Sequence, residues 1–266
     1  MTTPSGFAFL LTFYFPRPNW LFTLLPVPPE LAIVIPVFNE AENVHPLTEE
    51  VLAALTPTGR SFELVLVDDA STDATWKQIQ AEQARDSRVR GIRHLKNAGQ
   101  SAAVWTGFQH THSPLLATLD GDRQNDPADL PKLLLELKDC DFVCGKRTQR
   151  QDSWVRKASS KIARWARGAW LGADFEDTGC AVRVFKRETI ADLAPFNGLH
   201  RFLPILVQAN GAKTKEIPVN HRPRVAGVSK YGVWNRVWRG MYDLVGVSWY
   251  LKRRLKRVPV AHHPPQ

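Results

Sequence analysis

Short apolar runs alternate along residues 31–145 with longer segments in which apolar residues recur at helical spacing. The apolar runs predict five buried strands, at 31–37, 62–67, 89–94, 115–120 and 141–145. The segments between them predict four helices, at 42–55, 74–84, 99–110 and 128–138. Strands that alternate with helices at this spacing form parallel sheets, so the pattern predicts an α/β fold with helices on both faces of a mostly parallel central sheet.

The pattern is less regular after residue 150. It predicts, in order, a basic helix at 153–170, a strand at 180–185, helices near 186–194 and 199–210, and a strand ending at 217–219. A turn at 227–232 precedes a last helix, and 260–266 is expected to be a frayed tail. Residues 1–30 precede the first strand as an N-terminal extension whose role the sequence leaves unknown.

The distribution of charge adds a second pattern. The 266 residues carry a net charge of +9, with 44% hydrophobic and 23% charged residues, which excludes wholesale disorder. Residues 146–170 hold eight basic residues and one acidic residue, and residues 222–257 hold ten and one, so the rest of the chain is net acidic. Two basic segments on an acidic body indicate an anionic partner: nucleic acid, a membrane or a phosphorylated ligand.

The three cysteines are too few for a disulfide scaffold, and their spacing fits no zinc site. A reducing, cytosolic setting is therefore expected. No apolar run reaches the ~18–20 residues that a membrane-spanning helix needs. Residues 7–15 are apolar but lack a basic flank and a cleavage site, so they predict no secretory signal; an interfacial anchor and an extension without structure both remain open.

The last helix carries a stripe of apolar residues followed by a basic end. The stripe comprises Val233, Trp234, Val237, Trp238, Met241, Leu244, Val245 and Trp249. Such a helix either packs on the core or lies in an anionic lipid interface. The sequence thus predicts a protein that at most lies on a membrane.

Polar side chains follow the predicted strands, where ligands of open α/β sheets bind. Glu40 follows the first strand, and Asp68 and Asp69 follow the second. Acidic residues after a buried strand are typical of sites that bind ribose or base, but they also cap helices.

The fourth strand ends in two carboxylates and an amide at alternate positions: Asp120, Asp122 and Gln124. Alternate residues of an extended segment project to one side. Hard oxygen ligands of this kind suit Mg²⁺ or Mn²⁺ shared with a diphosphate.

Basic and acidic residues later in the chain add candidates for phosphate chemistry. Arg147 and Arg156 suit phosphate oxygens, although a solvated helix face is an alternative for this segment. Asp177 is a candidate general base or a turn residue. Arg224 and Lys230 lie on a glycine-containing loop that could close over a diphosphate.

Six motifs occur in order between about Leu31 and Lys252: IPVFNEAEN, VDDASTD, DGDRQNDP, GKRTQRQDSWVRK, DTGCAVRVFKRE and HRPRVAGVSKY. With them the chain resembles inverting family 2 glycosyltransferases of the GT-A fold. The resemblance is to the polyprenyl-phosphate branch, which includes dolichyl-phosphate mannose synthases and undecaprenyl-phosphate 4-deoxy-4-formamido-L-arabinose transferases. It implies a GT-A catalytic domain at 31–220, and a donor-closing loop plus an amphipathic basic helix at 221–266.

The resemblance implies a reaction and its partners. A sugar would move from a UDP- or GDP-sugar to a dolichyl or undecaprenyl phosphate, with Mg²⁺ or Mn²⁺, at the cytoplasmic face of the membrane. The enzyme would be peripheral on an anionic membrane surface. A homo-oligomer or a membrane-protein partner is left open.

The resemblance also implies three groups of site residues. The donor would be bound by Pro36, Phe38, Glu40, Val67, Asp69, Asp120, Gly121, Asp122, Arg224 and Lys230. The metal would be held by Asp122 and Gln124, with Asp120 nearby, and the acceptor phosphate by Arg147 and Arg156. Asp120, Asp122 and Asp177 are the residues expected to act in the chemistry, Asp177 as a base or as an orienting group.

The sequence departs from the family pattern in two ways. Gly121 and Arg123 replace the second and fourth residues of a DADLQ-type sequence, and many relatives continue into transmembrane helices that are not seen here.

Three rival interpretations of the function are considered. The nearest rival is a family 2 enzyme with a saccharide or other soluble acceptor. A basic nucleic-acid-binding module lacks a groove-reading motif, so no nucleic acid is expected. A non-catalytic membrane-surface scaffold would not need the DGDRQ sequence.

Overall fold

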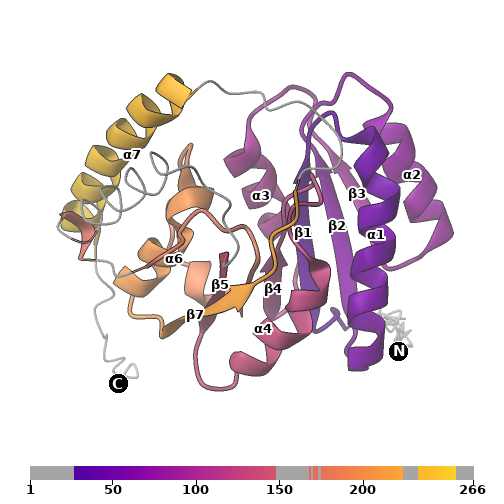
Figure 1. Cartoon of the computed structure of the whole chain (residues 1–266), viewed down its shortest axis with the longest axis horizontal. Helices are drawn as coiled ribbons and strands as arrows, with labels where there is room; N and C mark the ends of the chain where they lie inside the picture. The colour runs from indigo at the N-terminus through magenta and orange to yellow at the C-terminus, as the bar shows by residue number, and fades with distance from the viewer. Residues whose placement is uncertain (1–26, 148–167, 169, 173–174, 224–232, 256–266) are drawn as a thin grey trace, which may run out of the picture.

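The computed structural model describes residues 27–147, 168, 170–172, 175–223 and 233–255, with side chains of the last helix from residue 241 onward (Figure 1). Within these residues, seven strands form one sheet in the order β3-β2-β1-β4-β6-β5-β7. They are β1 (Leu31–Val37), β2 (Phe62–Asp68), β3 (Val89–Arg93), β4 (Leu115–Thr118), β5 (Phe142–Arg147), β6 (Arg183–Lys186) and β7 (Thr214–Val219). The predicted α/β architecture is confirmed.

Helices cover both faces of the sheet (Figure 1). They are α1 (Ala41–Leu55), α2 (Thr75–Arg85), α3 (Gln100–Gln109), α4 (Leu130–Glu136), α6 (Leu199–Ala209) and α7 (Val233–Arg253), with short 3₁₀ turns η1 (Thr56–Thr58), η2 (Pro127–Asp129) and η3 (Arg187–Ile190). Alternate residues of β1 point to opposite faces: Ile33 packs in a core with α1, α2 and α4, and Val34 in a core with α3, α6 and α7. Two separate apolar cores thus hold the sheet rigid between them.

β6 is the antiparallel strand in an otherwise parallel arrangement. It pairs with β4 on one side and β5 on the other, and Thr118 of β4 lies opposite Arg183 of β6. The beginning of β6 therefore meets the carboxyl ends of β4 and β5. This reversal brings residues 177–183 to the edge of the sheet where the sequence places the candidate ligands.

Several predicted elements differ in detail. The strand expected at 180–185 begins at Arg183, and the helix expected near 186–194 is the single turn η3, close to Pro195, which cannot donate a backbone hydrogen bond. The predicted helix at 128–138 is divided between η2 and α4. The predicted basic helix at 153–170 and the turn at 227–232 fall almost wholly outside the described residues.

The described part of α7 has two distinct faces. Val247 and Ser248 are buried on the side that packs with α6. Three members of the predicted apolar stripe, Met241, Val245 and Trp249, are instead 56%, 56% and 65% exposed. The core-packing alternative therefore does not account for these three side chains. Among the described residues, no helix combines the length and the apolar character needed to cross a bilayer.

Candidate functional site

The loops that follow β1, β2 and β4 all contain a non-glycine residue with positive φ. These residues are Asn39 (φ 54°), Ala70 (φ 59°) and Arg123 (φ 59°). The left-handed region is unfavourable for residues with a Cβ, and such strain gathers at functional sites. The Ser71 hydroxyl accepts a hydrogen bond from the Asn39 amide at 2.9 Å, and the Asn39 side chain accepts one from the Thr72 amide at 2.8 Å. The ends of β1 and β2 are thus held together by their own loops.

The loop after β4 presents Asp120 and Asp122 at this edge of the sheet. Gln100, at the start of α3, donates to the Asp120 carboxylate at 2.8 Å, and the Asn125 side chain accepts from the Asp120 amide at 2.9 Å. Burial and the nearby negative charge of Asp122 raise the pKa of Asp120 to about 6. Two carboxylates that repel each other at a fixed place, with Gln124 in the same loop, are the hard oxygen donors that a divalent cation needs. These residues therefore fit the predicted metal.

Gly121 stands where this loop touches the end of β1. A Cβ at this position would lie 2.8 Å from Val37 Cγ1 and 2.9 Å from the Pro36 carbonyl oxygen. The second of these atoms belongs to the backbone, so a side chain would push the loop away from β1. The departure from the family pattern at Gly121 therefore allows a closer approach of the two strand ends.

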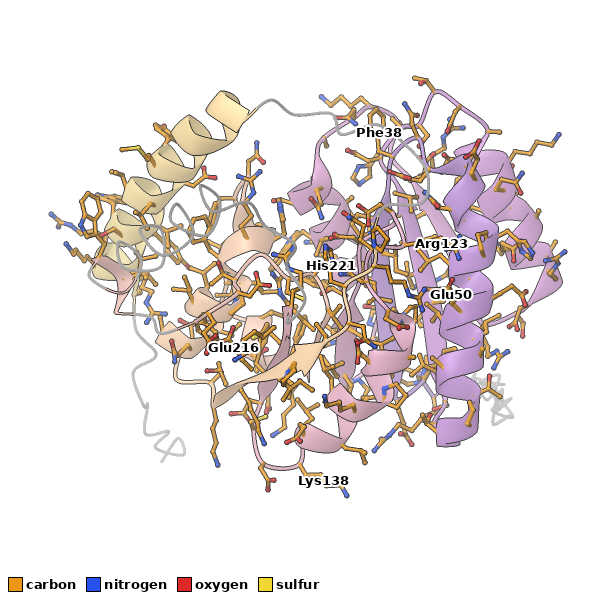
Figure 2. All side chains as sticks on the ribbon, viewed as in Figure 1. Phe38, Glu50, Arg123, Lys138, Glu216 and His221 are labelled. Atoms are coloured by element: carbon orange, nitrogen blue, oxygen red, sulfur yellow. The ribbon has the colours of Figure 1, made fainter. Side chains whose placement is uncertain are left out.

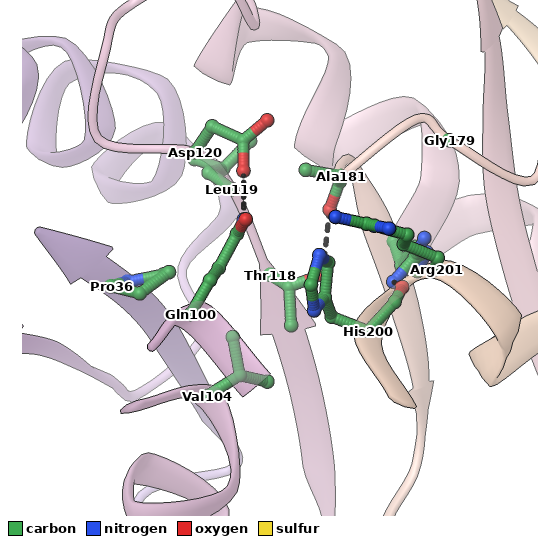
Figure 3. A pocket seen from close by; sticks show the side chains of 11 residues that line it. Pro36, Gln100, Val104, Thr118, Leu119, Asp120, Gly179, Ala181, His200 and Arg201 are labelled. Carbon is green, nitrogen blue, oxygen red and sulfur yellow. Dashed lines mark hydrogen bonds between the residues drawn. The ribbon is translucent and has the colours of Figure 1, made fainter. Parts of the chain in front are cut away.

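A cavity of about 220 Å³ opens beside Asp120 (Figure 3). It lies between α3 and β4 on one side and α6 and the segment before β6 on the other. Its lining residues are Pro36, Gln100, Val104, Thr118, Leu119, Asp120, Gly179, Ala181, Arg183, His200 and Arg201. Apolar walls with a few polar groups are typical of a small-molecule site.

Arg147 and Asp177 lie at the same edge and bind each other. Arg147 Nε donates to Asp177 Oδ2 at 2.6 Å, and Nη2 donates to Oδ1 at 2.7 Å. Their side chains are 18% and 7% exposed. Glu216 of β7, labelled in Figure 2, fixes the turn by accepting the backbone amides of Glu176 and Asp177 at 2.8 and 2.9 Å. Asp177 is thus held in a defined orientation, because its carboxylate accepts two hydrogen bonds from the Arg147 side chain and its amide donates one to Glu216.

The other predicted donor residues differ in their surroundings. Pro36 lines the cavity, and half-buried Phe38 lies at the end of the sheet (Figure 2). Glu40 precedes α1 and accepts from Asn43 at 2.6 Å. Val67 is fully buried in the core. The Asp69 carboxylate accepts the amides of residues 98 and 99 at 2.8 Å and contacts a histidine at 2.7 Å, so it orders the loop before α3.

Three predicted residues, Arg156, Arg224 and Lys230, lie outside the described residues. Their assignments to the acceptor phosphate and the donor diphosphate stay predictions.

A charged network that the sequence does not reveal supports the loop that carries Asp120 and Asp122. Glu50 of α1 accepts from Arg123 Nη2 at 2.5 Å with one oxygen and from Arg222 Nη1 at 2.6 Å with the other (Figure 2). Arg222 Nη2 lies 2.7 Å from Asp126 Oδ1, and its amide donates to the Gln124 carbonyl at 2.9 Å. Arg123, the second departure from the family pattern, thus ties the loop to α1.

Arg183 and His200 are two of the cavity-lining residues that sequence reasoning missed. Arg183 is 4% exposed and donates to the carbonyls of His200 at 2.7 Å and Thr178 at 2.9 Å. A buried arginine in a strand end is the signal that could have singled it out within DTGCAVRVFKRE. His200 lies inside a helix with no motif around it that indicates a role.

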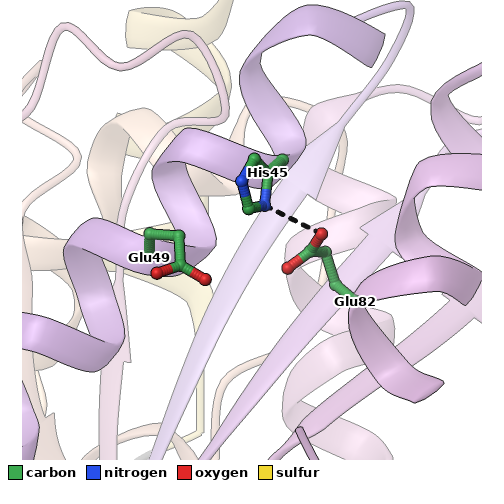
Figure 4. Close-up of side chains that lie close together, drawn as sticks. All are labelled: His45, Glu49 and Glu82. Carbon is green, nitrogen blue, oxygen red and sulfur yellow. Dashed lines mark hydrogen bonds and ion pairs between the residues drawn. The ribbon is translucent and has the colours of Figure 1, made fainter. Parts of the chain in front are cut away.

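A second group with ligand chemistry lies between α1 and α2, apart from Asp120 (Figure 4). One atom each of His45, Glu49 and Glu82 lies within 4.8 Å of the others. Arg85 Nη1 is already 2.9 Å from His45 Nδ1, 3.5 Å from Glu82 and 3.9 Å from Glu49. The guanidinium therefore supplies the positive charge that this cluster requires.

Comparison with known proteins gives one family and several relatives. Residues 32–188 match the model of "Glycosyl transferase family 2". Dodecaprenyl-phosphate galacturonate synthase of Rhizobium johnstonii is 36% identical over 233 residues, which are 85% of this chain and 69% of that protein. Undecaprenyl-phosphate 4-deoxy-4-formamido-L-arabinose transferase of Edwardsiella ictaluri is 36% identical over 218 residues, 81% of this chain and 66% of that one. The chain thus spans about two thirds of the length of these curated relatives.

Among solved structures, the fold is shared with glucosyl-3-phosphoglycerate synthase from Mycobacterium tuberculosis in complex with Mn²⁺, uridine-diphosphate-glucose and phosphoglyceric acid. The TM-score is 0.58 at 16% identity, and the match covers 84% of this chain and 79% of that one. At this identity the likeness concerns the fold alone.

Proposed function

The chain belongs to glycosyl transferase family 2, and from this membership we propose that it transfers a sugar from a nucleoside-diphosphate donor to a polyprenyl phosphate. The observation that carries the proposal is the meeting of Asp120, Asp122 and the Arg147–Asp177 pair at one edge of the sheet, beside a cavity. This arrangement offers a metal and diphosphate site next to a site for a second phosphate. The curated relatives, by their names, act on dodecaprenyl and undecaprenyl phosphates.

The donor lies along the ends of β1, β2 and β4 in this proposal. Its nucleoside contacts Pro36, Phe38 and Glu40, and its diphosphate lies at the Asp120–Asp122 loop. Arg224 and Lys230 close over the diphosphate from the segment after β7. The close packing of Gly121 on the end of β1 keeps the nucleoside and diphosphate sites at a fixed separation.

A divalent cation, Mn²⁺ or Mg²⁺, is the proposed cofactor, held by Asp122 and Gln124 with Asp120 beside them. When bound, such an ion stabilises the negative charge that grows on the leaving diphosphate. The glucosyl-3-phosphoglycerate synthase named above holds Mn²⁺ together with its donor. The raised pKa of Asp120 supports the assignment, because a site that disfavours two negative charges gains from a cation.

The acceptor phosphate binds at Arg147 and Arg156 in this proposal and attacks the anomeric carbon from the side opposite the diphosphate, so the configuration inverts. A phosphate monoester has a second pKa near ~6 and is largely ionised at neutral pH. A strong general base is therefore unnecessary. The Asp177 carboxylate, already bound by the Arg147 side chain, orients that guanidinium rather than removing a proton.

The exposed face of α7 brings the acceptor to the site. Met241, Val245 and Trp249 form an apolar surface on this helix, and Lys252 and Arg253 follow at its end. Apolar and aromatic side chains next to a basic end suit the interface of an anionic membrane. We therefore place the enzyme peripherally on the cytoplasmic face of the membrane.

The test is a transfer assay with undecaprenyl phosphate in anionic liposomes. UDP-galacturonate, UDP-4-deoxy-4-formamido-L-arabinose, UDP-glucose and GDP-mannose are supplied in turn with Mn²⁺ or Mg²⁺. A lipid-linked sugar that forms with one donor and requires both metal and lipid supports the proposal. Transfer only to a saccharide or another soluble acceptor, or no transfer from any donor, overturns it.

A further inference from the structure

His200 stands in the cavity beside Asp120 with one ring nitrogen already engaged. It is the second residue of α6, and its ring projects between the Gln100 and Asp120 side of the cavity and Arg201 (Figure 3). Its Nδ1 lies 2.6 Å from the Ser101 hydroxyl, which comes from α3. The other ring nitrogen, Nε2, makes no hydrogen bond within the described part of the chain, so it is the atom left for a ligand.

The hydrogen bonds of Ser101 favour one position for the ring proton of His200. Its oxygen accepts from the Gly198 amide at 2.9 Å, and the contact with His200 Nδ1 is its other hydrogen bond among the described residues. A hydroxyl has a single proton, and the bond to Nδ1 gives that proton an acceptor. With the hydroxyl as the donor, Nδ1 carries the lone pair and the ring proton is on Nε2, which is the tautomer that the proposal below requires.

The surroundings also keep the ring uncharged. Burial, Arg201 and Arg183 lower the pKa of His200 to about 3. Imidazole is therefore neutral at every pH at which the fold is expected to work. A neutral ring with a fixed Nε2 proton is a permanent hydrogen-bond donor, and it is too weakly basic to act as a general base.

We propose that His200 binds the sugar of the donor, by donating its Nε2 proton to a hydroxyl oxygen of that sugar, and that Ser101 is the positioning residue that fixes the ring for this contact. The proposal rests on the proposed function, because the sugar of a nucleotide donor is attached to the diphosphate and must lie beside Asp120. The cavity offers this place: Pro36, Val104 and Leu119 give it apolar walls on which a sugar ring can pack. A neutral hydrogen-bond donor between such apolar walls suits a ligand with many hydroxyl groups.

The first test reads the tautomer directly and needs no ligand. Long-range ¹⁵N–¹H spectra of the protein labelled on histidine separate a protonated from an unprotonated ring nitrogen. We expect His200 to show a protonated Nε2 and an unprotonated Nδ1 from pH 6 to pH 8. In Ser101→Ala we expect this single tautomer to be lost. A protonated Nδ1, or an imidazolium at pH 6, overturns the proposal.

The second test uses two substitutions of His200 whose side-chain amides place a hydrogen-bond donor at different distances from the backbone. The side-chain amide of His200→Gln reaches the place of Nε2, whereas that of His200→Asn reaches only that of Nδ1. Affinities are measured with Mn²⁺ for UDP and for UDP-glucose, UDP-galacturonate and UDP-4-deoxy-4-formamido-L-arabinose. Loss of one neutral hydrogen bond should weaken binding of the preferred UDP-sugar by about 3- to 10-fold in His200→Asn and in Ser101→Ala, but less in His200→Gln.

Binding of UDP itself is the internal control, because UDP lacks the sugar that a UDP-sugar carries on its diphosphate. It should be the same in the wild type and all three variants. An equal loss of UDP and UDP-sugar affinity, or equal effects of the Asn and Gln variants, overturns the sugar contact. So does a wild type that binds UDP and every UDP-sugar equally well. The proposed function is overturned by a different result, the absence of a lipid-linked product. The tautomer of His200 and the comparison of UDP with UDP-sugars can still be interpreted in that case.

Discussion

Arg147 and Asp177 form a two-pronged ion pair, with 2.6 Å between Nε and Oδ2 and 2.7 Å between Nη2 and Oδ1. The sequence offers these residues separately, one as a phosphate ligand and the other as a possible base. Their pairing makes them one unit, in which the carboxylate holds the guanidinium at the edge of the sheet. An incoming phosphate would therefore meet a prearranged arginine.

Removal of one member of this pair should destabilise the fold. The side chains are largely buried, and a buried charge left without its partner costs about 3–5 kcal/mol. Urea denaturation should show that Arg147→Ala lowers the free energy of unfolding by an amount at the lower end of this range. The double variant Arg147→Ala/Asp177→Ala should lower it by less. The adjacent pair of Lys146 and Glu176 is the matched control, because it is more exposed and Lys146→Ala should cost less than about 1 kcal/mol. Equal losses at both pairs would contradict a structural role for the buried one.

Arg147→Lys should affect the acceptor more than the donor. Lysine keeps the charge but loses the planar fork that matches both a carboxylate and a phosphate. We expect KM for undecaprenyl phosphate to rise by about tenfold, the size of one charge-assisted hydrogen bond, with KM for the donor unchanged. Steady-state kinetics with each substrate varied in turn provide the check. Unaltered acceptor kinetics would remove Arg147 from the acceptor site.

The sequence predicted most of the sheet because its strands are short apolar runs that end in polar residues. It also predicted that the residues of those ends meet, since parallel strands share one edge. It could not predict the reversed direction of β6, which depends on how β4 and β5 pair across the fold. The Arg147–Asp177 contact follows from that reversal, so it was hidden as well.

The residues that sequence reasoning missed have a common physical reason. Glu50 lies in a helix where it looks like any solvated acidic residue, and His200 lies in a helix that is mostly apolar. Their roles come from partners more than 70 residues away in the chain, Arg123 and Arg222 for Glu50 and Ser101 for His200. A local pattern carries no trace of such contacts. The DGDRQ sequence is different, because its ligand atoms are close neighbours along the chain.

Asp122→Ala should abolish transfer and leave the fold intact. Asp122 lies in a loop and is only partly buried, so its loss would remove the proposed metal ligand without opening the core. We expect kcat to fall by at least about 10²-fold, as for the loss of a group that stabilises developing charge. Thermal denaturation without metal should be unchanged or shifted upward, because the repulsion on Asp120 is also removed. Full activity in this variant would overturn the metal assignment.

Metal affinity should depend on pH through Asp120, whose pKa is raised to about 6 by burial and by Asp122. A cation binds the deprotonated carboxylate, so Kd for Mn²⁺ should rise by up to about tenfold per pH unit below pH 6. The folded protein binds the proton more tightly than the unfolded chain, so the metal-free fold should lose stability as the pH rises from about 4 to about 6. Calorimetric titration at pH 5, 6 and 7.5 measures the first effect. Asp120→Asn should abolish the pH dependence and unfold at a higher temperature at pH 7.5, and a Kd that is constant over this range would contradict the assignment.

Glu50→Gln should weaken metal and donor binding although Glu50 touches neither. The carboxylate joins Arg123 of the proposed metal-binding loop to Arg222, which directly precedes the predicted diphosphate-closing segment. A neutral amide cannot balance two guanidinium groups, and the ion pair of Arg222 with Asp126 then has to stand without Glu50. We expect KM for both Mn²⁺ and the donor to rise by about tenfold, with a modest loss of stability of about 1 kcal/mol because the pair with Arg123 is only partly buried. Glu49→Gln is the control: Glu49 is the preceding residue of the same helix, is 57% exposed and faces Arg85, so its loss should change neither KM. If Glu50→Gln and Glu49→Gln both bind metal and donor as the wild type does, the ion pair between Arg123 and Glu50 does not support the loop. The departure from the family pattern at Arg123 would then have no effect on binding.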